Sequence, residues 1–220
     1  MTARANWADP GHWAVFAFAT TSFALGYVNS GWIGATAVFV VLPLALIFGG
    51  LVQLLVAILE IFRKNIFGAC VFGTYGPFWI IYGLYVEFFA SSVSKVDAGA
   101  TAALFLAMFA VMTFFFVIAS FATDWVLVAV FTLIDVALIL LAIGAGLATS
   151  TLTHIGGYVT IAFAVLAWYH ALGGLVQGTF GRDLIPFWHP ETGLATPAAP
   201  ATPTASGLNP LTPGGPAARN

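Results

Sequence analysis

Long apolar runs separated by short polar breaks are the dominant pattern of this chain. A bilayer core about 30 Å thick takes about 20 apolar residues per helical crossing. Six runs approach or exceed that length, and they cover residues 12–28, 37–62, 67–89, 100–122, 125–147 and 155–176. The pattern predicts an all-α integral membrane protein with six transmembrane helices per protomer. The breaks are short, so neighbouring helices are expected to be antiparallel.

Basic residues are distributed unevenly between the two sets of loops. With an even number of crossings, Lys95 falls on one side and the other basic residues fall on the opposite side. The second group consists of Arg4, Arg63, Lys64, Arg182 and Arg219. Lys and Arg near helix ends stay in the cytoplasm. We therefore expect both termini to be cytoplasmic, in a multi-pass protein of the cell membrane.

Composition agrees with a lipid environment and excludes several functions. The chain is 61% hydrophobic and 6% charged, against about 25% charged residues in soluble domains. Six Lys and Arg residues and a net charge of -2 leave no basic surface for nucleic acid. The single cysteine, Cys70, and the four scattered histidines lack metal-ligand spacing, so neither a metal nor a cofactor is expected. The sequence has no hydrolase or zinc-protease motif, so we do not expect an enzyme.

The two ends of the chain differ from its middle. Residues 1–11 are predicted to be a short N-terminal segment without a cleavable signal, because Arg4 is followed by Asp9-Pro10 rather than by a short apolar region. Residues 12–188 are predicted to form the transmembrane domain. Residues 189–220 are rich in Pro, Ala and Thr, a composition that cannot bury enough apolar surface to fold, so a disordered tail is expected there.

Few ionisable residues fall inside the runs, and each costs about 2.5–3.5 kcal/mol at the centre of a membrane helix. Asp135 lies in the middle of the fifth run, where it either faces a hydrated path or is protonated or paired inside the bundle. His170 lies in the sixth run, as a proton relay or as a packed histidine with one hydrogen bond. We regard both as proton-coupling candidates. Glu60 has Arg63 and Lys64 within one turn, which favours a structural ion pair.

Neutral polar groups gather at a few places along the runs. Thr20 and Thr21 lie midway along the first run, and Gln53 lies in the second. Thr74 begins the stretch Thr74-Tyr75-Gly76-Pro77, which we expect to interrupt the third helix and free backbone carbonyls for a cavity. Asp9-Pro10 precedes the first run, either as an anion site at a helix N-terminus or as a plain helix cap.

One short sequence occurs twice. Gly49-Gly50-Leu51-Val52-Gln53 in the second run recurs as Gly173-Gly174-Leu175-Val176-Gln177 in the sixth. Paired glycines let membrane helices approach closely, which is the favoured explanation. A true structural repeat is the alternative.

Several motifs in order resemble those of the acetate uptake transporters, the family of the bacterial succinate-acetate permease and its fungal relatives. The first is the stretch that runs from Phe48-Gly49-Gly50 through Gln53, Glu60, Lys64-Asn65 and Phe67-Gly68 to Phe72-Gly73-Thr74-Tyr75-Gly76-Pro77-Phe78-Trp79. Two further pieces are Leu140 to Gly144 and Trp168-Tyr169-His170-Ala171 with the later Phe180 to Pro186. The resemblance covers about residues 9 to 187.

The resemblance implies a homo-hexamer in which each protomer carries its own pathway for acetate and related carboxylates. It also implies a narrow apolar constriction formed by Phe18, Tyr75 and Ile134. The family's opening Asn-Pro-Ala-Pro-Leu-Gly-Leu appears here as Asp9-Pro10-Gly11-His12-Trp13-Ala14-Val15. Asp in place of Asn brings a negative charge to the expected entrance for an anion, and His12 is a candidate compensating cation.

Together these features predict a transporter or channel for acetate and related short-chain carboxylates, including succinate, that couples transport to protons or moves the neutral acid. The predicted partners are therefore a small carboxylate, protons, the lipid bilayer and further copies of the chain. The predicted substrate pathway contains Asp9, Pro10, His12, Thr20, Thr21, Gln53, Asn65 and Thr74. A passive pore for ammonia or another anion is the alternative. A membrane scaffold or sensor with a partner-binding tail is a third hypothesis.

Overall fold

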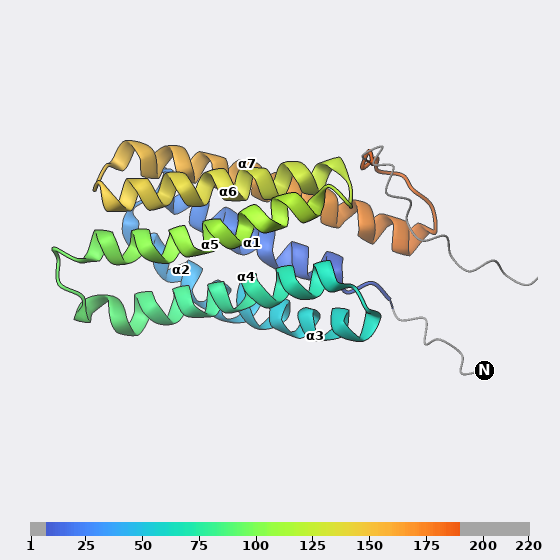
Figure 1. Cartoon of the computed structure of the whole chain (residues 1–220), viewed down its shortest axis with the longest axis horizontal. Coiled ribbons are helices and arrows are strands. Elements are labelled where there is room, and N and C mark those ends of the chain that lie inside the picture. Colours follow the sequence, from blue (N-terminus) through green and yellow to red (C-terminus); the bar gives the residue numbers. More distant parts are fainter. Residues whose placement is uncertain (1–7, 190–220) are drawn as a thin grey trace, which may run out of the picture.

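The computed structural model describes residues 8–189, and this part of the chain consists of helices and short connections without β-strands. The long helices lie roughly parallel to one another in one bundle (Figure 1). The long helices are α1 (Gly11–Asn29), α3 (Gln53–Arg63), α4 (Ile66–Leu84), α5 (Ala98–Ser120), α6 (Trp125–Gly146) and α7 (Ser150–Phe180). The shorter ones are η1 (Ala35–Ala37), α2 (Val38–Pro43), η2 (Leu44–Val52), η3 (Tyr85–Phe89) and η4 (Ala90–Ser92). The disordered tail predicted from residue 190 onward lies outside the described residues.

Five segments in the described part are long and apolar enough to cross a membrane. They are Ala35–Arg63, Ile66–Ser92, Ala98–Ser120, Trp125–Gly146 and Ser150–Phe180. The 19-residue helix α1 is not among them. It carries the polar residues Thr20, Thr21 and Ser22, and its small residues Ala14, Ala17 and Ala19 are completely buried. At 1.5 Å per residue, α1 is still about 28 Å long, close to the thickness of a bilayer core.

The start of α1 and the end of α7 lie at the same end of the bundle (Figure 1). The turn between α3 and α4, which carries Lys64, and the turn between α5 and α6 lie there too. The connections between α4 and α5 and between α6 and α7 lie at the opposite end. Arg63 and Arg182 therefore share one end of the molecule, and Lys95 belongs to the other, as the distribution of basic residues predicted.

Irregular backbone occurs in the second apolar run and at the end of the third, but not at Thr74 to Pro77. Helix α4 continues without a break through Pro77, so the predicted interruption at Thr74 to Pro77 is wrong. In the second run, α2 ends at Pro43 and the chain continues as the π-helical segment η2 before α3 begins. Proline removes a backbone donor and disturbs the preceding turn, and π-helical turns accommodate such a disturbance without ending the helix.

Glycine allows η2 and α4 to pack at backbone distance. A Cβ atom on Gly76 would lie 2.9 Å from the backbone nitrogen of Leu54 and 3.1 Å from the carbonyl oxygen of Gly50. A Cβ atom on Gly49 would lie 2.9 Å from both the Thr21 hydroxyl and the Trp79 ring. Larger side chains would separate these helices. The close-approach explanation for the first glycine pair is therefore consistent with the structure.

Beyond α7 the chain folds back over the bundle. Gly181 ends the helix in the left-handed conformation, with φ of 67°. The carbonyl of Trp188 accepts a hydrogen bond from the backbone nitrogen of Trp125, and the Tyr169 hydroxyl donates to the carbonyl of Pro186. The segment 181–189 is thus attached to the start of α6 and to the last turns of α7.

Candidate functional site

Two cavities follow one another along the inside of the bundle. The first, of about 140 Å³, is lined by His12, Gln53, Asn65 and His170 among others, and we call it the His12 cavity. The second, of about 210 Å³, is lined by Ser22, Asn29 and Thr160 together with many apolar side chains, and we call it the Ser22 cavity. The residues that line both cavities are Phe18, Tyr75 and Ile134. The structure therefore brings the three residues of the predicted constriction together between the two cavities.

Aromatic packing fills this junction. The ring centroids of Phe18 and Tyr75 are 5.2 Å apart, and those of Phe18 and Phe163 are 5.7 Å apart. Phe18, Tyr75 and Ile134 are 8%, 3% and 3% exposed. The Tyr75 hydroxyl shares a 2.7 Å hydrogen bond with the hydroxyl of the fully buried Thr113 on α5. The Tyr75 hydroxyl thus has its hydrogen-bond partner on α5, and the apolar ring of Tyr75 contacts Phe18 at the junction.

The His12 cavity contains polar atoms that lack a partner in the described structure. Gln53 is completely buried; its amide nitrogen donates to the carbonyl of Gly49 at 2.6 Å, and its Oε1 has no hydrogen-bond partner. The Nδ1 atoms of His12 and His170 are also buried and unpartnered. Buried polar atoms in proteins nearly always have a partner, so a cavity lined by several that lack one suits a polar ligand or water.

The other ring nitrogen of His170 is held by Asp124, the N-cap residue of α6. Nε2 of His170 lies 3.1 Å from Oδ2 of Asp124, and both residues are buried. The remaining carboxylate oxygen, Oδ1, accepts a 2.9 Å hydrogen bond from the backbone nitrogen of Leu127 and so caps α6. The rings of His12 and His170 have centroids 5.6 Å apart. Two histidines and a carboxylate from α1, α6 and α7 therefore meet at one side of the cavity.

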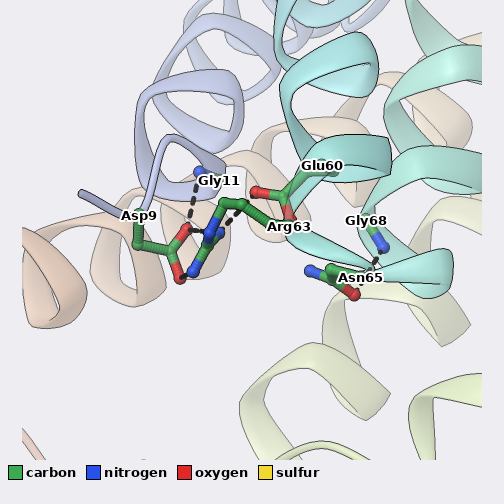
Figure 2. A network of polar contacts seen from close by, with 6 residues as sticks. All are labelled: Asp9, Gly11, Glu60, Arg63, Asn65 and Gly68. Atoms are coloured by element: carbon green, nitrogen blue, oxygen red, sulfur yellow. Dashed lines mark hydrogen bonds and ion pairs between the residues drawn. The ribbon is translucent and has the colours of Figure 1, made fainter. Parts of the chain in front are cut away.

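Asp9, which lines the same cavity, forms an ion-pair network with Arg63 and Glu60 (Figure 2). The two guanidinium nitrogens of Arg63 donate to the two Asp9 oxygens at 2.7 and 2.8 Å, and Nη1 also donates to Oε1 of Glu60 at 2.7 Å. Figure 2 shows Arg63 between the two carboxylates, with Gly11 donating to Asp9. The predicted pairing of Glu60 with a nearby cation is confirmed for Arg63.

The negative charge of Asp9 is stabilised by hydrogen bonds from Arg63 and from the backbone of Gly11. Partial burial acts to raise the pKa of this carboxyl, but the hydrogen bond from Arg63, the backbone N–H of Gly11 and the charge of Arg63 outweigh it and hold the pKa below its ordinary value of 3.8. Asp9 is therefore ionised at neutral pH and forms an ion pair with the Arg63 guanidinium. Its Oδ1 accepts from Gly11 at 2.8 Å, so it also satisfies one free backbone donor at the start of α1.

Asn65 reaches the cavity from the turn between α3 and α4 (Figure 2). Lys64 ends α3 in the left-handed conformation with φ of 62°, and Asn65 follows as the N-cap of α4. Its Oδ1 accepts from the backbone nitrogen of Gly68 at 3.1 Å. The cap uses the carbonyl end of the amide, so the Nδ2 donor remains suited to an anion.

Part of the predicted pathway lies elsewhere. Within the described residues, neither cavity is lined by Pro10, Thr20, Thr21 or Thr74. The Thr20 hydroxyl accepts from Nε1 of Trp168 at 3.1 Å. The hydroxyls of Thr20 and Thr21 each donate to a carbonyl one turn earlier in α1. Thr20 thus joins α1 to α7, and the Thr21 hydroxyl is satisfied within α1.

Asp135 also lines neither of the two cavities. It lines a surface groove between α5 and α6, together with Ala107, Ala110, Ile139 and Ala142, and its Oδ1 has no hydrogen-bond partner there. Ile134, the preceding residue, lies at the junction. Successive residues of a helix point about 100° apart. The neighbouring side chains therefore face different environments, and whether Asp135 takes part in proton coupling stays a prediction.

Three residues of the site were not among the predicted site residues. Asp124 is hydrogen-bonded to His170, and Thr113 is hydrogen-bonded to Tyr75. Ser22 is buried and lines the Ser22 cavity, and its hydroxyl has no hydrogen-bond partner. The sequence contains a signal for Asp124, since an Asp immediately before an apolar helix is typical of an N-cap. Nothing in the sequence indicates that its second oxygen meets a histidine on α7. No cluster of three or more metal-ligating side chains occurs among residues 8–189.

Comparison with known proteins places the whole bundle in one family. The model of the GPR1/FUN34/yaaH family matches residues 1–182. Ammonia transport outward protein 2 of Saccharomyces cerevisiae is 31% identical over 77% of this chain, and acetate permease A of Emericella nidulans is 29% identical over 84%. The chain spans 62% and 67% of the lengths of these two fungal relatives.

Bacterial relatives match over nearly their whole length. The succinate-acetate/proton symporter SatP of Escherichia coli is 25% identical over 81% of this chain and 94% of its own. A solved structure of the bacterial acetate channel SatP superposes with a TM-score of 0.77, at 25% identity, over 83% of this chain and 99% of that one. The apolar helices and these relatives establish a multi-pass membrane protein, and the chain belongs to the GPR1/FUN34/yaaH family.

Proposed function

We propose that this protein moves acetate and related short-chain carboxylates, including succinate, across the cell membrane through the His12 cavity, the junction and the Ser22 cavity. The observation that carries this proposal is the junction itself. Two cavities inside one bundle share Phe18, Tyr75 and Ile134, which close the space between them with apolar surface. An acetate permease and a succinate-acetate/proton symporter among the relatives support the choice of substrate.

The size and lining of the cavities suit a small solute with one polar end. At about 140 and 210 Å³, both are smaller than the roughly 300–1,000 Å³ typical of pockets for drug-sized ligands. Apolar side chains at a constriction exclude hydrated ions. A carboxylic acid that has lost its charge presents a methyl group and two hydrogen-bonding oxygens, and it can pass such a junction at far lower cost than the anion.

The membrane arrangement follows from the ends of the bundle. In the proposed topology α1 crosses the membrane as well as the five apolar segments, which makes six crossings. The end with Arg63 and Arg182 faces the cytoplasm, because Lys and Arg near helix ends are retained there. Both termini and the His12 cavity then face the cytoplasm, and the Ser22 cavity faces outward. A homo-hexamer in which each protomer has its own pathway is proposed from the resemblance to the acetate transporters.

Transport is proposed to be coupled to protons. A carboxylate that enters the His12 cavity as an anion must gain a proton before it passes an apolar junction. Of the two candidates for this role, His170 lines the His12 cavity and Asp135 lines the groove between α5 and α6. The arrangement therefore favours His170 as the coupling residue.

The test is uptake of labelled acetate into vesicles that contain the purified protein, with protein-free vesicles as the measure of passive leak. We expect saturable uptake that unlabelled acetate and propionate inhibit and that an inward proton gradient accelerates. Uptake no faster than in protein-free vesicles would refute the proposal.

Ammonia is the second candidate substrate, because a yeast relative is named an ammonia transport outward protein. The junction would also pass neutral ammonia, since it has no charged side chain. The two functions are distinguished by measuring ammonia flux in the same vesicles through the change in internal pH. If ammonia is the substrate, its flux is raised by the protein and acetate does not compete.

A further inference from the structure

Close packing fixes the rings of His12 and His170, and the Nδ1 atom of each ring has no hydrogen-bond partner. A Cβ atom on Gly174 would overlap the His12 ring, and one on Gly173 would overlap the ring of Phe187. Phe187 in turn stacks on His170, with centroids 4.8 Å apart. The second glycine pair thus makes room for His12 and for the residue that covers His170. Neither ring can turn freely, and both Nδ1 atoms are buried without a partner.

Asp124 determines which nitrogen of His170 takes up a proton. The carboxylate accepts through Oδ2, so Nε2 of His170 carries hydrogen in the neutral ring, and Nδ1 is left with a free lone pair. His170 is only 7% exposed, and its ring lines the His12 cavity. Protonation at Nδ1 therefore creates a new donor inside a buried site, next to an anion that stabilises the imidazolium.

The charges around the two histidines make proton binding and anion binding depend on each other. The groups whose electrostatic fields reach His12 are Asp9, His170, Arg63 and Asp124. Glu60 belongs to the same network through Arg63, so the groups around the two histidines include three carboxylates and one guanidinium. The remaining titratable groups nearby are directed elsewhere: Lys64 is exposed in its turn, Asp183 accepts from Gln177, Tyr169 donates to Pro186, and His189 contacts Thr123. A carboxylate thus meets net negative charge unless the histidines are protonated.

We propose that His12, His170 and Asp124 form a proton-loading site that binds the carboxylate group of a small monocarboxylate in the His12 cavity. The inference rests on the proposed function and names the residues that supply its proton. The protonated Nδ1 atoms of His12 and His170 donate to the carboxylate oxygens. One N–H bond then breaks and one O–H bond forms, so the neutral acid leaves toward Phe18 and Tyr75 and one imidazole returns to its neutral form.

The direct test is whether the binding of acetate is accompanied by the uptake of protons. Titration calorimetry with sodium acetate, in two buffers of different ionisation enthalpy, gives the number of protons taken up when acetate binds to the detergent-solubilised protein. We expect net proton uptake by the wild type at neutral pH.

His170→Gln and His12→Gln keep a polar side chain that does not titrate, so both should bind acetate at least tenfold more weakly and show less proton uptake. His154→Gln, at an exposed histidine near the opposite end of α7, is the matched control and should resemble the wild type.

Asp124→Asn separates electrostatics from folding, because Asn is an equally good N-cap and keeps the hydrogen bond from Leu127. Loss of the carboxylate beside His170 should weaken acetate binding and reduce the proton uptake that accompanies it. Unchanged proton uptake in both histidine variants, with normal acetate uptake into vesicles, would overturn the proton-loading site and leave the proposed function intact. Absence of acetate binding and transport in the wild type would overturn both.

Discussion

The rings of Phe18 and Tyr75 meet with centroids 5.2 Å apart, between two cavities that both residues line. Phe18 comes from α1 and Tyr75 from α4, and Ile134 from α6 joins them there. A contact between three helices of the bundle thus separates the His12 cavity, which is lined by two histidines, from the Ser22 cavity, which is lined by none. The consequence is that side-chain size at this contact should control which solutes pass.

Tyr75→Ala is expected to widen the junction. It removes a nearly buried ring, so carboxylates larger than acetate, such as butyrate, should enter vesicles faster relative to acetate than they do with the wild type. Tyr75→Phe keeps the ring and loses only the hydrogen bond to Thr113, and it should keep the wild-type order of substrates. The measurement is initial uptake of labelled acetate and butyrate. The same substrate order in Tyr75→Ala as in wild type would contradict the assignment.

The Asp9–Arg63 ion pair should contribute to stability at neutral pH and lose that contribution in acid. The pKa of Asp9 is lowered in the folded protein, so the contribution is complete above the ordinary value of 3.8 and disappears as the pH falls through the lower folded value. Asp9→Asn should lower the midpoint of thermal unfolding at pH 7, by the equivalent of about 0.2–1 kcal/mol for a half-exposed pair. In strong acid the two proteins should unfold at the same temperature. An unchanged difference across this range would argue against the pair.

Asp135 and His170 give opposite predictions for proton coupling. The Asp135 side chain lines the groove between α5 and α6, and that of His170 lines the His12 cavity. We therefore expect Asp135→Asn to transport acetate with the wild-type response to a pH gradient, and His170→Gln to lose much of that response. Uptake with and without an imposed gradient distinguishes them. Loss of the gradient response in Asp135→Asn alone would instead support the hypothesis that Asp135 carries the proton.

Gly174→Ala tests whether the second glycine pair exists to seat His12. The added methyl group would occupy the space of the His12 ring, so the ring must leave its position. We expect a lower midpoint of thermal unfolding and weaker acetate binding. Gly178→Ala, one turn later in α7, meets nothing within 4 Å and is the control. Because Ala is the better helix former, this control should be as stable as the wild type or more stable by about 0.5–1 kcal/mol. Normal acetate affinity in Gly174→Ala would count against the role of His12.

The sequence predicted the helical membrane fold well because apolar length and loop charge are local properties. The five apolar segments match the predicted runs closely, and Lys95 lies at the end of the bundle away from Arg63. The helix at 155–176 proved longer, since α7 spans Ser150–Phe180. The prediction of a break near Pro77 failed because a proline and its flanking glycines do not reveal whether neighbouring helices hold the segment straight. The irregular backbone follows Pro43 and, in the third run, begins only at Tyr85.

By themselves the apolar runs, the loop charges and the ordered motifs determined a membrane protein, its expected orientation and its family. They could not determine which polar side chains share a cavity. That depends on the direction in which each helix faces, and a rotation of 100° per residue separates Ile134 at the junction from Asp135 in the groove. Only the tertiary structure placed Asp124 beside His170, Asp9 beside Arg63, and Thr20 against Trp168. Such contacts join residues far apart in the chain, and they form only when packing fixes the rotation of each helix.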